Sequence, residues 1–186
     1  MADQRLTALV ARAFATAWPD RKKALEREWA QLQVRFAQHG MGRSSSLMDA
    51  LTNAGSNLLE VAWTELWSAV ERSLSSGAVL ADAITTPDIT QAIRPPLDQV
   101  LQFVDNGLRK AAANMGFPTK WSVAEKYQRL LAKTGLEADL LLPTLARLEA
   151  ELPARPLQPW YQRPVGIVVL GVIASILAFL LIALLR

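Results

Sequence analysis

Few residues of this chain are of types that carry out chemistry. The 186-residue sequence has no Cys and a single His, His39. A Cys-based zinc site and a two-His metal site therefore cannot form from its own residues. His39 precedes Gly40, where a helix is predicted to end, and this position favours a capping or solvent-exposed role. The sequence also contains no Gly-rich phosphate loop and no nucleophile elbow, so the common motifs of phosphoryl and acyl transfer are missing.

Acidic side chains are the remaining candidates for acid–base chemistry, but their spacing keeps most of them apart. Glu60, Glu65 and Glu71 are not three or four residues from one another, so they do not converge on one helix face. Asp98 and Asp105 do share a face, although the positions between them offer no third ligand. The formal net charge of +3 is far from the basic excess of nucleic-acid-binding proteins. We predict that the chain is not an enzyme and uses no cofactor, no metal ion, no small-molecule substrate and no nucleic-acid partner.

The elements that would position these side chains are all helical. Apolar residues recur with the period of an α-helix, and no stretch alternates apolar and polar residues, so no sheet is predicted. The longest pattern predicts a helix over residues 47–74, opened by a capping box of Ser46 and Asp49 and kinked or split near Gly55. The other predicted helical segments cover residues 6–17, 25–36, 78–84, 86–94, 97–115, 122–133 and 137–152.

Proline and glycine set the predicted ends of these segments. Pro19 interrupts the first apolar stripe, and Pro95-Pro96 stops one helix and starts the next. Gly116 and Gly135 each end a helix, because glycine adopts the left-handed conformation that is common just after a helix.

Trp is unusually frequent, with six residues in a chain of this size. Trp63 and Trp67 lie one turn apart and form a broad apolar ridge on the helix over 47–74. Core packing is the simpler interpretation, and we expect Trp63 in particular to be buried. The alternative is an exposed ridge that binds a helix of a partner protein, because Trp is enriched at interface positions that contribute most binding energy.

The end of the chain predicts a membrane anchor. Residues 165–185 are 21 consecutive residues without a charge, and 15 of them are Val, Ile, Leu or Phe. A helix of this length spans about 32 Å at about 1.5 Å per residue, which matches the hydrocarbon thickness of a bilayer. Arg147, Arg155 and Arg163 precede the run, and only Arg186 follows it. The positive-inside bias therefore predicts that the body lies in the cytoplasm.

The residues next to this run fit a membrane interface. Residues 153–164 contain four Pro, which predict a semi-rigid linker between the body and the span. Trp160 and Tyr161 are predicted to lie at headgroup level, where amphipathic rings are enriched. Arg163 and Arg186 bracket the span and are predicted to lie at its two interfaces.

Small residues recur four positions apart within the predicted span. Gly171 is followed by Ser175, and Ala174 by Ala178. This spacing lets two transmembrane helices approach closely, so these residues form a candidate contact face for self-association in the membrane.

These patterns predict an all-α protein, a multi-helix bundle with a single C-terminal transmembrane helix. We expect a cytoplasmic helical bundle at 1–152, a Pro-rich juxtamembrane linker at 153–164 and a transmembrane helix at 165–185. The Ala, Leu and Arg content is typical of GC-rich bacterial coding sequences, so the bacterial inner membrane is the expected location.

The expected function is that of a tail-anchored, non-enzymatic interaction or regulatory module at the cytoplasmic face of a membrane. Its expected partners are the lipid bilayer and either another protein or a second copy of the chain. The alternative is a membrane-active effector, pore-forming or membrane-perturbing, that oligomerises through the anchor. Residues 21–28 and 125–133 are densely charged, which favours the first hypothesis because helices that insert into lipid have few charges.

Overall fold

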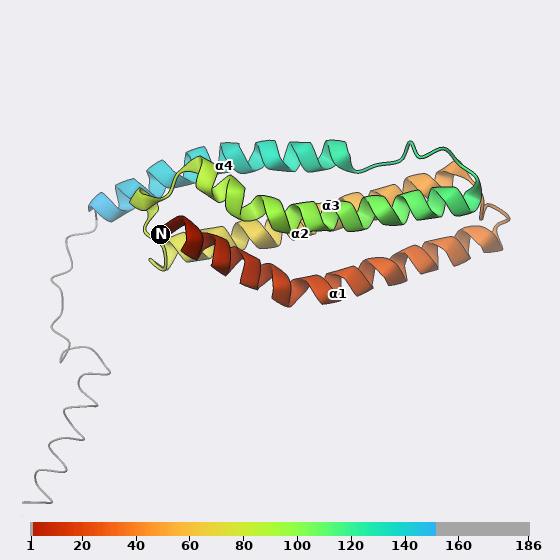
Figure 1. Cartoon of the computed structure of the whole chain (residues 1–186), viewed down its shortest axis with the longest axis horizontal. Helices are drawn as coiled ribbons and strands as arrows, with labels where there is room; N and C mark the ends of the chain where they lie inside the picture. Colours follow the sequence, from red (N-terminus) through yellow and green to blue (C-terminus); the bar gives the residue numbers. More distant parts are fainter. Residues whose placement is uncertain (1, 152–186) are drawn as a thin grey trace, which may run out of the picture. The chain divides into compact units, whose positions relative to one another are not determined.

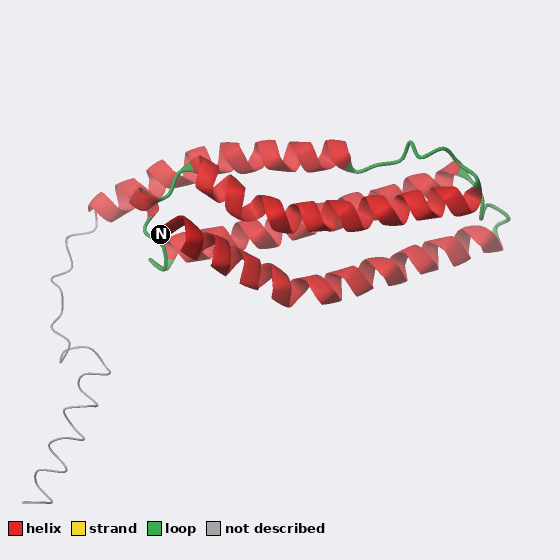
Figure 2. Ribbon diagram, in the orientation of Figure 1, coloured by secondary structure: helices red, strands yellow, loops and turns green. Residues whose placement is uncertain are grey.

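The described part of the chain is entirely helical. The computed structural model describes the backbone of residues 2–151 and the side chains of residues 4–148. Figure 2 shows no strand among these residues, which confirms the predicted all-α class for them. Contacts divide the chain into two compact units, Met1–Arg147 and Leu148–Arg186, and the helix packing described below belongs to the first. The helices are α1 (Ala2–Gln38), α2 (Ser45–Ser75), α3 (Thr86–Met115) and α4 (Ala124–Glu151), with a 3₁₀ turn, η1 (Ala81–Ala83), before α3.

Successive helices run antiparallel, in the up-down-up-down order of a four-helix bundle (Figure 1). Helices α1, α2 and α3 pack directly on one another. Helix α4 joins them through side chains that reach α2 and α3, including a hydrogen bond from Trp63 on α2 and one to Asp139 from Thr86 on α3. The segment predicted as a helix over 78–84 forms only the short turn η1.

Helix α2 confirms the predicted long helix, with two differences in detail. Its N-cap is Ser44 rather than Ser46, because the Ser44 hydroxyl accepts a hydrogen bond from the backbone N–H of Leu47 at 3.2 Å. The helix continues through Gly55 and does not split there. A Cβ at Gly55 would lie 2.4 Å from Cγ1 of Val104, so glycine here allows α2 and α3 to pack closely.

The predicted breaks at proline were wrong, because α1 continues through Pro19 and α3 through Pro95-Pro96. Each proline removes one backbone hydrogen bond and crowds the preceding turn, which bends a helix without necessarily ending it. Figure 1 shows α1 bent near its middle and α3 bent in its first half. The apolar face of α3 stays buried across its bend, at Ile93, Pro96 and Leu97, and this packing holds the helix together.

The two predicted glycine stops have different outcomes. Gly116 caps α3 with a φ of 74°, as predicted. The predicted stop at Gly135 was wrong, because α4 continues to Glu151. Leu130, Thr134 and Ala138 are buried on one side of α4, so tertiary packing stabilises the helix on both sides of Gly135.

Trp29 fixes α1 against α3. A Cβ on Gly107 of α3 would lie 2.1 Å from Cζ3 of Trp29, so the indole fills the space that this glycine leaves. The ring stacks on Phe103 with 6.4 Å between ring centroids, and its Nε1 donates a 3.1 Å hydrogen bond to the Leu51 carbonyl of α2. One side chain of α1 thus contacts both neighbouring helices and sets the position of α1 on them.

Candidate functional site

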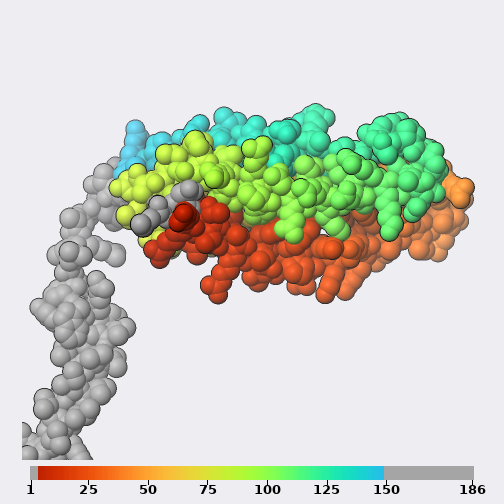
Figure 3. All heavy atoms as spheres, in the orientation of Figure 1, coloured from red at the N-terminus to blue at the C-terminus, as the bar shows by residue number. Residues whose placement is uncertain are grey.

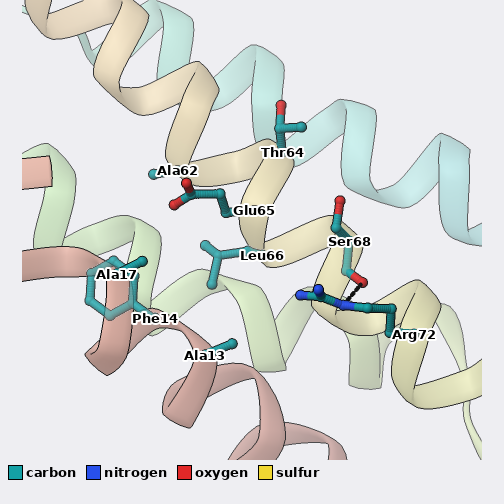
Figure 4. Close-up of a pocket in the computed structure, with 9 residues that line it drawn as sticks. All are labelled: Ala13, Phe14, Ala17, Ala62, Thr64, Glu65, Leu66, Ser68 and Arg72. Carbon is teal, nitrogen blue, oxygen red and sulfur yellow. Dashed lines mark hydrogen bonds between the residues drawn. The ribbon is translucent and has the colours of Figure 1, made fainter. Parts of the chain in front are cut away.

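A groove runs along α1 and α2. Its central hollow has a volume of about 330 Å³. Figure 4 shows α1 on one side of the hollow and α2 on the other. The lining residues are Ala13, Phe14 and Ala17 from α1 and Ala62, Thr64, Glu65, Leu66, Ser68 and Arg72 from α2.

Small side chains create this hollow. Ala13 and Ala17 lie one turn apart on α1, just before the bend at Pro19, and Ala62 lies opposite on α2. Their methyl groups leave part of the space between α1 and α2 unfilled. Leu66 is buried and closes the floor.

The hollow continues along the helices in both directions. A second depression of about 250 Å³ shares Ala13 and Arg72 with the first. A third, of about 140 Å³, lies beyond Arg21, whose guanidinium pairs with Glu65 of the central hollow. We call the three depressions together the α1–α2 groove.

Charged groups border the groove. The Arg21–Glu65 ion pair bridges it from α1 to α2, with 48% and 36% of the two side chains exposed, so it adds little to stability. Arg72 donates one hydrogen bond from Nε to the Ser68 carbonyl at 3.1 Å. Figure 4 shows the rest of its guanidinium directed over the central hollow, where its remaining N–H groups could meet a carboxylate.

The tryptophans singled out in the sequence are core residues. Trp63 and Trp67 are 3% and 6% exposed and stack with 6.0 Å between ring centroids. The Trp63 indole donates a 2.9 Å hydrogen bond to Thr134 of α4, and the Lys133 ammonium lies 4.0 Å from the centre of a Trp63 ring. The Trp67 indole donates to Glu71 at 2.8 Å. An exposed ridge for a partner helix does not fit this burial, because α4 of the same chain covers Trp63.

The glutamates of α2 go to separate partners, as their spacing predicts. Glu60 accepts a hydrogen bond from the Lys126 ammonium at 2.7 Å, and this bond and the positive charge lower the pKa of the Glu60 carboxyl. Glu65 pairs with Arg21, and Glu71 with Trp67.

The two aspartates of α3 share a face, as predicted, and both hold the start of α4. Asp98 accepts a hydrogen bond from the Tyr127 hydroxyl. Burial, and then this bond, raise the pKa of Tyr127. Asp105 accepts from the Ser122 hydroxyl at 3.1 Å and from the Val123 N–H at 3.2 Å. The Ser122 hydroxyl also accepts a 3.1 Å hydrogen bond from the Ala124 N–H at the start of α4.

His39, the remaining residue considered for chemistry in the sequence analysis, lies outside the groove. It is exposed at the end of α1. No group of three or more His, Cys, Asp or Glu in the described part is placed to hold a metal ion. The groove offers a carboxylate and a guanidinium on apolar walls, an arrangement suited to binding.

The membrane residues predicted from the sequence cannot be placed. Trp160, Tyr161, Arg163, Gly171, Ala174, Ser175, Ala178 and Arg186 all lie outside the described residues. Within residues 2–151, no helix combines the length and the apolar character needed to cross a bilayer.

Sequence reasoning missed the groove. Ala13 and Ala17 lie in the helix predicted over 6–17, and Ala62 lies in the helix predicted over 47–74. Apolar periodicity does not show which small residues of a helix lack a neighbour that fills the space beside them. Comparisons of the chain with protein-family models, curated proteins and solved structures found no match. The groove is therefore assigned from its own residues.

Proposed function

We propose that this chain is a tail-anchored, non-enzymatic interaction module that binds a helix of a partner protein in the α1–α2 groove at the cytoplasmic face of a membrane. The uncharged run of residues 165–185 carries the membrane part of this proposal. The groove supports the interaction part, because an amphipathic helix can place its apolar side chains in a channel between two helices.

The groove indicates the chemistry of the partner. Its apolar lining consists of three alanines, Phe14 and Leu66, so short apolar side chains of the partner would enter the central hollow. A carboxylate of the partner would lie beside Arg72, since the groove's own Glu65 already pairs with Arg21. The expected partner segment is an amphipathic helix with an Asp or Glu next to its apolar stripe.

Site-specific photocrosslinking in membranes of the source cell tests this contact. A photoreactive amino acid at Ala13 should crosslink a protein partner, and the same group at the exposed Lys23 of α1 should not. Arg72→Glu should abolish the crosslink by repelling the partner's carboxylate. Arg109→Glu on α3, also exposed but outside the groove, should leave it unchanged. Equal crosslinking from Ala13 and Lys23, or no effect of Arg72→Glu, would remove the groove from the proposal.

Anchoring is tested separately. The full chain should stay with the membrane fraction after a high-salt wash, and a chain ending at Gln162 should leave it. A truncated chain that still sediments with membranes would contradict the single anchor. Release of a dye trapped in vesicles by the full chain would instead support the membrane-active effector.

A further inference from the structure

Two leucines on the outer face of α4 are exposed. Leu136 and Leu140 are 68% and 73% exposed, the highest fractions among the large apolar side chains of the described residues. They lie one turn apart. Tyr127, Leu130 and Ala138 of the same helix are buried against the bundle, so the two leucines occupy the opposite side.

Other residues extend this face along the helix. Arg129 lies seven positions before Leu136, Pro143 lies seven after it, and Arg147 lies seven after Leu140. Residues seven apart share a helix face, and all three are exposed. We define the outer α4 patch as Arg129, Leu136, Leu140, Pro143 and Arg147.

The charges near the patch favour an anionic surface. The patch itself carries two arginines, one of which pairs with Glu125 on the same helix. Two further acids adjoin the leucines in the sequence. Glu137 pairs with the Lys133 ammonium at 3.5 Å, and Asp139 accepts a 2.6 Å hydrogen bond from the Thr86 hydroxyl of α3. Figure 3 shows α4, in cyan to blue, along one edge of the bundle, on the side away from α1.

The position of α4 in the chain indicates what covers this patch. If residues 165–185 span the membrane, as the proposed function requires, only 13 residues separate the end of α4 at Glu151 from the span. A chain of this length reaches at most about 50 Å, at about 3.3–3.6 Å per residue. The patch is thus held beside the bilayer at a high effective concentration, where a contact too weak to recruit a free protein can still persist.

We propose that the outer α4 patch lies against the lipid headgroup region, with Leu136 and Leu140 in the interface and Arg129 and Arg147 beside lipid phosphates. Interfacial helices combine apolar and basic residues in this way. A second copy of the chain fits less well. A stable protein interface buries about 800 Å² on each partner, far more than two leucines provide. The bundle would then rest on its α4 side, and the α1–α2 groove would remain open to a partner.

The absence of Cys makes a direct test possible with the full chain. Leu140→Cys provides a single attachment site for an environment-sensitive fluorophore. Val34→Cys is the matched control, because Val34 is 57% exposed and lies on α1. Both labelled chains are reconstituted into vesicles of phosphatidylcholine, with and without phosphatidylglycerol, and co-flotation with the vesicles is measured first.

The proposal expects a blue-shifted emission at position 140 that lipids carrying a nitroxide near the headgroup quench, and neither effect at position 34. Chains that float but show no quenching at position 140 would overturn this inference and leave the anchor intact. A blue shift without lipid quenching would also overturn it and would indicate a protein neighbour such as a second copy. Chains that do not float would overturn the proposed anchor and this inference with it.

Discussion

The indole Nε1 of Trp63 donates a 2.9 Å hydrogen bond to the hydroxyl of Thr134, 71 positions further along the chain. The Thr134 hydroxyl donates in turn to the Leu130 carbonyl at 2.9 Å. Trp63 is 3% exposed and Thr134 is fully buried, so each polar group satisfies the other where water cannot. This contact sets the register of α4 on α2 and makes Trp63 both a core residue and a link between helices.

Trp63→Ala should therefore lower the free energy of unfolding by about 3–5 kcal/mol, because it removes a large buried side chain and leaves a cavity. Thr134→Val keeps the shape of its side chain and leaves the indole N–H unpaired, which should cost about 1–3 kcal/mol. Urea unfolding of a chain ending at Gln162 measures both changes. A Trp63→Ala chain as stable as the wild type would overturn the core assignment.

Substitution of alanine for two glycines in helix interiors should change the stability of the protein in opposite directions. Gly55→Ala places a Cβ 2.4 Å from Val104 Cγ1, so α2 and α3 must separate and stability should fall. Gly135→Ala meets nothing within 4 Å and should raise stability by about 0.5–1 kcal/mol, because alanine loses less entropy in a helix. Melting curves of the two variants measure the signs. A shift in the same direction for both would contradict the close packing at Gly55.

These glycines also show where sequence reasoning ends. Apolar periodicity was sufficient to predict helices over most of the described residues, and it placed Trp63 in the core. It could not separate a glycine that ends a helix, Gly116, from one that α4 continues through, Gly135. The difference lies in packing against other helices, which a local pattern does not contain. The predicted interruption at Pro19 was wrong for the same reason, since α1 continues through it.

The candidate site was harder to predict than the fold. Arg21 and Glu65 are 44 positions apart, and their pairing across the groove depends on how α1 packs on α2. Leu136 and Leu140 belong to a leucine-rich segment in which periodicity alone did not show which side faces outward. The hydrogen bond from Thr86 to Asp139 supplies part of that orientation, and it joins residues 53 positions apart.

A fall in pH should lower the contribution that the N-terminal end of α3 makes to stability. The carboxylate of Asp88 accepts hydrogen bonds from the Thr85 hydroxyl at 2.6 Å and from the Thr85 N–H at 2.8 Å, and these lower the pKa of Asp88 below its ordinary value of 3.8. A lowered folded-state pKa gives stability that is present above pH 3.8 and is lost as the pH falls through the folded-state pKa.

Asp88→Ala should therefore lower stability at neutral pH, because it removes the carboxylate of the capping box, and the difference from the wild type should shrink as the pH falls below 3.8. Asp82→Ala, at an exposed position in η1, is the control and should change little at either pH. Urea unfolding at neutral and acidic pH measures the difference. A cost that does not depend on pH would assign the effect to helix propensity rather than to the carboxylate.

The small residues of the predicted span give the last prediction. Gly171→Ile and Ser175→Ile both add apolar bulk, so insertion into the membrane should be kept while close approach of two spans is prevented. Crosslinking of the full chain in bilayers should show fewer dimers for either variant than for the wild type. Leu177→Ile, within the span but outside the small-residue pairs, is the matched control and should leave the dimer yield unchanged. An equal yield in the wild type and both Ile variants would place any self-association in the helical body, where the α1–α2 groove and the outer α4 patch are the surfaces to examine next.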